Sequence, residues 1–406
     1  MRISTTQLFG LNVQQMNDQQ SELAQLYQQI ASGQAITTPS DNPLGASQAV
    51  QLSMQASELS QYTSNQSTAL TSLHAEDSTL SSVSTVLQSV NTQLVHAGDA
   101  SLSDSNRGAI AQDLIGLKNQ LLGLANANDG QGNYLFAGFQ TTSQPFSTNA
   151  AGTVSYNGDT GVRSIQVTSS HQVAVSDSGA SVFLSVAAVG TTSISAGSAS
   201  NTGTGVVGTV STLNASNPAN QDKYTITFAG SGASSTYTIT DNTTGTTGAA
   251  QPYSAGSAIT LGGQSVSITG APAAGDTFTV TPATQAGTDI FSSIDAAIAA
   301  LQTPVVGTAG SANLSNSLST AMQKVQNAMN NVVTVQASVG GREQELQALQ
   351  TVTQNSSLQT QSNLSDLTQI NLTSTISKYT MTQYALQAAQ QGFVKIQGMS
   401  LFNYIN

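Results

Sequence analysis

The chain has 406 residues, a mass of 41.4 kDa and a formal net charge of −11 from 9 basic and 20 acidic side chains. This length allows two or three domains, and the acidic balance argues against binding to a nucleic-acid backbone. The absence of cysteine excludes disulfides, thiolate metal sites and cysteine nucleophiles. Charged residues are only 7% of the chain, which suits a surface covered by copies or partners, or a soluble domain coated with Ser, Thr and Gln.

Neither a membrane span nor a cleaved leader is predicted. No apolar run approaches the roughly 18 residues that a span requires. The N-terminus lacks the basic and then apolar layout of a cleavable signal peptide. We therefore expect a protein that stays in the cytoplasm or leaves the cell by a route that does not cleave it.

The N-terminal segment is predicted to form a helix with a narrow packing seam. Apolar residues recur there at alternating steps of four and three, the spacing of coiled-coil packing. The seam consists of Phe9, Val13, Met16, Gln20, Leu23, Tyr27 and Ile30. We expect its apolar members to form an assembly interface.

A turn is expected to follow this helix. Gly33 is a candidate helix C-cap, and Asn42 is a candidate N-cap for a helix that resumes at the proline after it. The predicted motif turn contains Gly33, Pro39, Ser40, Asp41 and Pro43.

Two more helices are predicted before residue 130. Apolar residues from Leu80 to Leu94 recur at steps of three and four, and a similar face runs from Ile110 to Leu124 after a turn at Gly98. The aromatic run from Tyr134 to Phe139, with Pro145 and Phe146, is then expected to form a hairpin that leaves the helices.

The middle of the chain is predicted to be a β region. Alternating β-formers occupy residues 224–228, 237–239, 266–268 and 278–280, with turn residues at 241–245 and 262–263. Residues 190–218 are small and polar with little to bury, so they are expected to form a linker or long loops.

Helices are predicted again from residue 290 to the C-terminus. The stretch from Leu314 to Leu349 carries many Ala and Val seam positions, which allow close helix approach. The last helix repeats the seven-residue rhythm of the first one. Its predicted interface residues are Leu372, Ile376, Tyr379, Leu386 and Phe393.

No constellation indicates catalysis, a cofactor or a metal. Residues 203–208 fit the letters of a dinucleotide fingerprint but lack the flanking strand and helix. The three histidines, His74, His96 and His171, are scattered, whereas a metal site needs converging ligands. Glu343 and Glu345 point to different sides of a predicted helix and are interpreted as a solvated face.

The chain resembles flagellin-type axial proteins at both ends. Residues 30–46, with Ser32-Gly33 and the run Ser40-Asp41-Asn42-Pro43-Leu44-Gly45-Ala46, are similar to the segment after the first helix of that family. Residues 132–139, 339–342 and 399–405 are similar to its branch of hook–filament junction proteins, and they add Leu401 and Phe402 to the predicted interface.

The resemblance implies an α+β multidomain fold. A long-helix, coiled-coil-like bundle rod would be formed by both termini and carry a central, mostly β outer domain. The expected domains are a helical domain of residues 1–147 plus 286–406, a first β part of 148–189 and an inserted β module of 190–285. The extreme ends, about 1–40 and 365–406, would order on assembly, because so few buried seam positions offset backbone entropy poorly.

The resemblance also implies a function and partners. These are a homo-oligomeric ring at the hook–filament junction, a hook-side hook-associated protein 1, flagellin on the filament side and an export chaperone. The chain would be exported unfolded and uncleaved by the flagellar type III apparatus and would lie outside the cell, with no nucleic-acid or membrane partner. The alternatives are flagellin itself, or a surface adhesin that binds glycans through its β lobe.

Overall fold

The structure is a computed structural model that describes residues 5–150, 152–187 and 190–398. The chain divides into two compact units: a terminal unit of Met1–Ser64 and Leu349–Asn406, and a central unit of Asn65–Ala348. The boundary falls inside two long helices, so the domain limits expected from the sequence remain a prediction. The described helices are α1 (Thr5–Ser32), α2 (Pro43–Ala97), α3 (Asp104–Ala125), α4 (Gly179–Phe183), α5 (Ile290–Gln302), α6 (Gly307–Thr368) and α7 (Leu372–Gly398).

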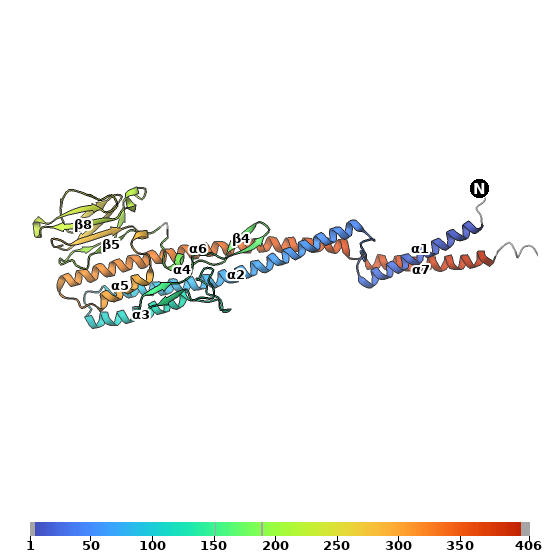
Figure 1. The fold of residues 1–406 in the computed structure, drawn as a ribbon, viewed down its shortest axis with the longest axis horizontal. Helices are drawn as coiled ribbons and strands as arrows, with labels where there is room; N and C mark the ends of the chain where they lie inside the picture. Colours follow the sequence, from blue (N-terminus) through green and yellow to red (C-terminus); the bar gives the residue numbers. More distant parts are fainter. Residues whose placement is uncertain (1–4, 151, 188–189, 399–406) are drawn as a thin grey trace, which may run out of the picture. The chain divides into compact units, whose positions relative to one another are not determined.

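In the terminal unit, α1 packs along α7, so the two ends of the sequence lie side by side (Figure 1). The turn after α1 also pairs with the segment between α6 and α7. The main-chain nitrogen of Ala35 donates to the Thr368 carbonyl at 2.7 Å, and that of Ile370 donates to the Gly33 carbonyl at 3.2 Å. Backbone hydrogen bonds therefore join the two ends of the chain next to the helix pair.

The ends of the helices follow the capping residues. Gly33 has a φ of 70°, a conformation that few residues other than glycine adopt easily, and its nitrogen donates to the Gln29 carbonyl at 2.8 Å. At the start of α2, the Asn42 side chain accepts from the Gly45 nitrogen at 2.9 Å. Asn371 caps α7 in the same way, at 3.1 Å from the Ser374 nitrogen.

The helical core of the central unit is made by α2, α3, α5 and α6. The predicted seam of α2, from Leu80 to Leu94, is buried, and α3 packs on α5. Beside these helices lies an aromatic cluster whose ring centroids are 5.3 to 6.1 Å apart; its members are Phe136, Phe146, Phe183 and Phe291. Such edge and tilted contacts stabilise a core beyond the area they bury.

The strands form two hairpins and two larger sheets, and all the pairings are antiparallel. The hairpins are β1–β2 and β3–β4. One larger sheet has the order β10-β9-β8-β14-β5, with β11 also on β9; the other has the order β12-β13-β6, with β7 also on β13. The strand bounds are β1 (Phe146–Thr148), β2 (Val154–Tyr156), β3 (Ser164–Thr168), β4 (His171–Ala174), β5 (Ile194–Gly197), β6 (Val206–Val207), β7 (Ser211–Thr212), β8 (Tyr224–Ala229), β9 (Thr236–Asp241), β10 (Thr246–Thr247), β11 (Gln251–Pro252), β12 (Ala258–Leu261), β13 (Gln264–Thr269) and β14 (Thr277–Thr281).

The two larger sheets share one apolar core, and we call the region from β5 to β14 the β module. Its buried residues follow the predicted alternation, with Tyr224, Ile226 and Phe228 directed inward from β8. Figure 1 shows the module beside α6. The α+β fold with helices at both ends and a central β region is thus confirmed.

Two local predictions are wrong. The expectation of a linker at residues 190–218 is wrong, because they contribute the short strands β5, β6 and β7, while the segments between these strands are loops as expected. The run from Tyr134 to Phe139 forms turns with a single bridge, Asn128 to Tyr134, and the hairpin is instead β1–β2, which begins at Phe146.

Residues 190–208 are ordered by polar side chains of α6 in addition to the burial of Ile194 and Val207. Asn316, 1% exposed, accepts from the Val207 nitrogen at 2.9 Å and donates to the Gly205 carbonyl at 3.0 Å. Gln323 accepts from the Ser195 nitrogen at 3.0 Å. The polar row of α6, spaced by three and four residues, comprises Asn313, Asn316, Thr320, Gln323, Asn327 and Asn330, and each donates a hydrogen bond to a main-chain carbonyl of residues 190–205.

Candidate assembly surfaces

The helix pair of the terminal unit has little buried surface of its own. Among the described side chains of α1 and α7, only Leu26 (8%) and Thr375 (9%) are less than a tenth exposed. The rings of Phe9 and Phe393 meet across the pair with their centroids 4.9 Å apart, yet Phe9 remains 48% exposed. The two helices contact each other along a seam, but they lack the buried apolar core of a stable helical bundle.

The predicted interface residues divide between this seam and the open surface. Half-buried positions in the pair are Val13, Met16, Leu23, Ile30, Tyr379, Leu386 and Phe393. The more exposed positions are Phe9, Tyr27 (64%), Leu372 (52%) and Ile376 (44%). Leu401 and Phe402 lie outside the described residues.

The prediction missed Leu26, which lies on the same helix face as Leu23 and Ile30. Its spacing of three residues from Leu23 and four from Ile30 is as good a seam as the path through Tyr27. The two paths differ by one residue, and only the partner helix selects between them.

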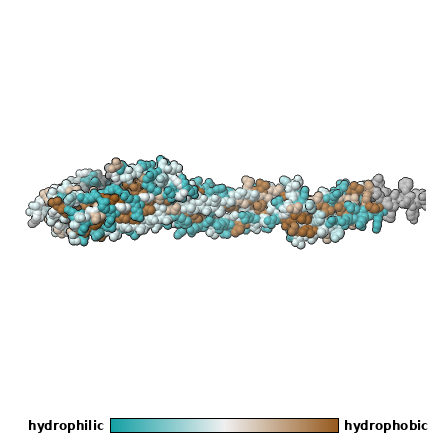
Figure 2. All heavy atoms as spheres, turned by 90° about the horizontal axis from the view of Figure 1, so that it is seen from below, coloured by the Kyte–Doolittle hydropathy of each residue, from teal (hydrophilic) through white to brown (hydrophobic). Residues whose placement is uncertain are grey.

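Large apolar side chains that remain in contact with solvent are concentrated in the terminal unit. Figure 2 shows several of them as brown side chains on the displayed face. They extend beyond the predicted seam, for example Met381 (75%), Tyr384 (72%) and Val394 (66%). A set of this size, spread over α1, α2, α6 and α7, makes this part of the chain a candidate surface for contact with other chains. The members are Phe9, Leu11, Tyr27, Leu44, Val50, Met54, Val352, Leu358, Leu372, Ile376, Met381, Tyr384 and Val394.

The predicted motif turn is organised by Asp41. Its Oδ2 accepts from the Thr37 nitrogen at 3.1 Å, the Thr37 hydroxyl at 2.8 Å and the Thr38 nitrogen at 2.8 Å. These hydrogen bonds lower the pKa of Asp41, with that from the Thr38 backbone contributing most. The carboxylate therefore fixes the loop through which α1 connects to α2.

Two of the three histidines singled out in the sequence contact the two glutamates within the central unit. His74 Nδ1 lies 2.8 Å from a Glu343 oxygen, and His171 Nε2 lies 2.7 Å from a Glu345 oxygen. The two glutamates of α6 thus reach α2 on one side and β4 on the other. The interpretation of a solvated helix face fits Glu345, whose side chain is 45% exposed, and is wrong for Glu343, whose side chain is 16% exposed.

A buried polar contact lies near these pairs. Arg342 bonds to the Asp177 carboxylate, and the Asp177 nitrogen donates to Glu76 Oε1 at 3.1 Å. Burial, and then repulsion from Asp177, raise the pKa of Glu76 to about 8, against the favourable charge of Arg342. These contacts fasten the segment before α4 to α2 and α6.

Neither chemistry nor a membrane span is indicated by what the structure describes. Within residues 5–150, 152–187 and 190–398, no group of three or more His, Asp or Glu side chains could hold a metal ion. In the same ranges, no helix is both long and apolar enough to cross a lipid bilayer.

Comparison with known proteins assigns the class first. Residues 3–141 match the family model of the bacterial flagellin N-terminal helical region, so this part of the chain is similar to flagellin-like axial proteins. Flagellar hook-associated protein 3 of Salmonella typhimurium is 30% identical over 403 residues, or 99% of each chain, and that of Escherichia coli is 30% identical over 405 residues, again 99% of each. The chain belongs to the flagellar hook-associated protein 3 family.

Solved structures agree with this assignment. Xanthomonas campestris FlgL is similar with a TM-score of 0.68 and 27% identity, covering 77% of this chain and 99% of that one. The flagellar hook-associated protein 3 of Legionella pneumophila gives a TM-score of 0.69 and 26% identity, covering 78% and 98%. The family is structural rather than enzymatic, and its role is at the hook–filament junction of the bacterial flagellum.

Proposed function

We propose that this chain forms a ring of identical subunits that joins the hook to the filament by packing of its terminal helices. The observation that carries the proposal is the exposed apolar surface of the terminal unit, where Met381 and Tyr384 of α7 are at least 72% exposed. Exposed apolar side chains of this size on the α1–α7 helix pair favour coverage by neighbouring subunits.

The interface comprises the predicted seams and the open face around them. The half-buried positions hold α1 against α7, while the exposed ones, such as Tyr27 and Ile376, face a neighbouring subunit. The seam and the exposed face lie on the same two helices, α1 and α7. Assembly therefore orders both helices and buries their apolar side chains in one step. The mechanism is geometric matching of helices without catalysis.

The partners in this proposal are other axial proteins. The ring contacts hook-associated protein 1 on the hook side and the first flagellins on the filament side. Before export, a chaperone covers the apolar terminal helices, and the chain then passes uncleaved through the flagellar export apparatus to the cell exterior. The absence of cysteine supports this route, because no disulfide can form before threading.

Flagellin is not kept as a second candidate. The matched flagellin model describes the N-terminal helical region, which axial proteins share, whereas both hook-associated relatives align over 99% of their length. The glycan-binding alternative has no observation in its favour within the β module.

Electron microscopy of cells that lack the protein tests the proposal. We expect complete hooks without filaments, and flagellin released into the culture medium. Normal filaments on such cells would overturn the proposed role, and re-expression of the full chain is the control.

A further inference from the structure

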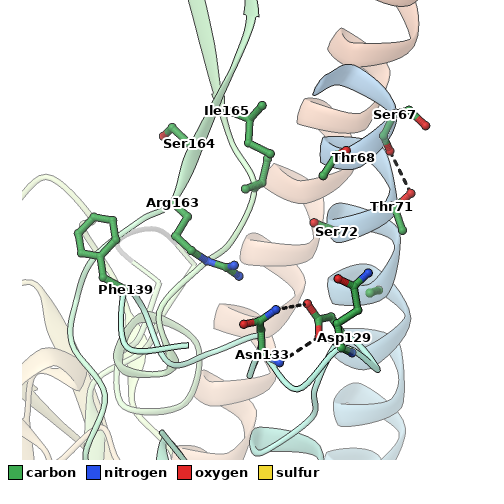
Figure 3. Close-up of a pocket in the computed structure, with 13 residues that line it drawn as sticks. Ser67, Thr68, Thr71, Ser72, Asp129, Asn133, Phe139, Arg163, Ser164 and Ile165 are labelled. Atoms are coloured by element: carbon green, nitrogen blue, oxygen red, sulfur yellow. Dashed lines mark hydrogen bonds between the residues drawn. The ribbon is translucent and has the colours of Figure 1, made fainter. Parts of the chain in front are cut away.

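A groove of about 710 Å³ opens on the central unit. Its walls are α2, the loop of residues 129–139 and the β3–β4 hairpin (Figure 3). Hydroxyl groups of α2, among them Ser67, Thr71 and Ser72, line one side. Arg163 and Phe139 line the other, and these two side chains define what the groove can bind.

Arg163 directs its guanidinium into the groove (Figure 3). Its Nε donates to the Ser176 hydroxyl at 3.4 Å, and its η nitrogens have no partner among the described residues. The other arginines in the described ranges, Arg107 and Arg342, each pair with a carboxylate. Arg163 therefore presents donors that fit an incoming carboxylate.

Asp129, the acidic residue that lines the groove, is occupied by its own loop. Its carboxylate accepts from the Gln131 nitrogen at 2.9 Å, the Asn133 nitrogen at 3.1 Å and the Asn133 side-chain nitrogen at 2.9 Å. These bonds shape the 129–139 loop and leave Arg163 without a carboxylate.

Phe139 places an aromatic ring at the edge of the groove with 65% of the residue exposed. Its main-chain nitrogen and that of Gly161 both donate to Asp159 Oδ1, at 3.0 and 2.7 Å. A Cβ atom at Gly161 would lie 2.1 Å from the ring, so the ring rests on the glycine backbone. The backbone thus supports the ring while much of its surface stays open.

We propose that this groove docks an acidic segment of a neighbouring copy of the same chain, an inference that rests on the proposed ring. An arginine and an aromatic side chain surrounded by hydroxyl and amide groups have the composition of an interface centre with a polar rim. The chain carries 20 acidic against 9 basic residues, so each copy offers carboxylates to the free guanidinium of the next one. Complementary charge of this kind fixes the register between subunits.

Crosslinking in assembled flagella tests the occupant. A photoactivatable amino acid replaces Ser72, inside the groove, in the full chain expressed in cells that lack the natural copy. We expect a covalent homodimer whose second peptide contains Asp or Glu, and no such product when the probe replaces Thr243 in the β module. An adduct with flagellin or hook-associated protein 1 alone, or no adduct, would overturn the second copy as occupant.

The same crosslinking experiment is repeated with variants of Phe139 and Arg163. Phe139→Ala combined with Arg163→Glu is expected to reduce the homodimer about tenfold or more, the scale of interface hot spots. Leu213→Ala and Lys223→Gln, exposed positions in or beside strands of the β module, serve as controls. Unchanged crosslinking in the groove variant would overturn the inference.

The two proposals fail in different experiments. Normal filaments on cells without the protein contradict the junction ring itself. Filament loss in those cells, together with unchanged crosslinking in a correctly folded groove variant, contradicts the groove alone. Secretion and circular dichroism of the variant establish that it folds.

Discussion

Glu76 is 1% exposed, and its titration makes the central unit sensitive to pH. Its pKa is about 8 in the folded protein, mainly because burial disfavours the carboxylate, against an ordinary value of 4.5. Between these two values the folded state holds one proton more than the unfolded state. The free energy of unfolding therefore falls as pH rises from 4.5 toward 8.

The substitution Glu76→Gln should remove this dependence. Glutamine keeps an acceptor for the Asp177 nitrogen and has no proton to lose. Near pH 5 the variant and the parent should be similarly stable. Above pH 8 the variant should be more stable by as much as ~5 kcal/mol, because the pKa rises from 4.5 to about 8 and each pKa unit is worth about 1.4 kcal/mol.

Thermal unfolding of the full chain from pH 5 to 8.5 measures the effect. Glu22→Gln, at an exposed position of α1, is the matched control. An equal difference between Glu76→Gln and the parent at every pH would contradict the assigned titration.

A second residue-scale prediction concerns the polar row of α6. Asn316→Ala leaves the Val207 nitrogen and the Gly205 carbonyl without partners, so it should cost about 1–3 kcal/mol. Hydrogen exchange at the Val207 amide should accelerate, because that amide loses its acceptor. Asn330→Ala, which removes two exposed hydrogen bonds of 3.2 Å, one to the Gly190 carbonyl and one from the Gln326 side chain, should change little. If both variants had the same effect, the buried amide would have no special role.

At the scale of elements, the helices could be predicted from the sequence because the spacing of their apolar residues and the positions of their capping residues agree. The apolar steps of α2 and α6, Gly33 after α1 and Asn42 before α2 each predict a boundary or a buried face that the structure contains. The main strands follow from alternation in the same way. Local pattern suffices where an element buries its own apolar side chains.

Elements that depend on distant polar partners could not be predicted. The strand β5 is held to α6 by Gln323, which follows it by more than a hundred residues. The pairing of His171 with Glu345 has the same character. A run of small polar residues is interpreted as a loop when only the sequence is known. The side-chain amides that hydrogen-bond to its main chain come from a distant part of the sequence. The exposed apolar face of the terminal unit could not be predicted for the same reason, because in the proposed ring its partners are other chains.

The α7 seam gives an element-scale prediction. Leu386→Asp together with Phe393→Asp introduces two carboxylates into the α1–α7 contact, where each costs several kcal/mol when covered. The subunit should be secreted normally, because its terminal pair is already largely exposed. Hooks should lack filaments, and flagellin should accumulate in the medium.

Gln383→Asp with Gln390→Asp provides the control, since both positions are exposed on α7 and lie seven residues apart. This pair should leave the filaments intact. Electron microscopy of cells and immunoblots of the medium report both results. Normal swimming of the seam variant would refute the proposed role of α7.

At the scale of the whole molecule, the two compact units differ in how many large side chains they bury. Most fully buried large side chains belong to the central unit, while the terminal helix pair has almost none. In dilute solution, thermolysin should therefore cut within about residues 1–40 and 365–406 and leave the body intact. Mass spectrometry of the fragments locates the cuts. Full protection of both ends in a demonstrated monomer would contradict this expectation.

The β module should be removable. The Thr288 hydroxyl donates to the Leu184 carbonyl, so the entry and exit of the inserted region meet. Replacing residues 194–285 by a short Gly/Ser linker would expose the polar row of α6, whose amides hydrogen-bond well to water. We expect the shortened chain to be exported and to support some motility. Loss of helical structure in it would show that the module belongs to the core.

The contact between Leu184 and Thr288 also makes this position suitable for the insertion of a reporter. A folded reporter whose own ends lie close together could replace the module without stretching the helices around it. A small peptide tag that binds a dye is suitable, because it does not need to fold. Such a tag would mark the base of each filament in living cells and make the timing of filament growth directly observable.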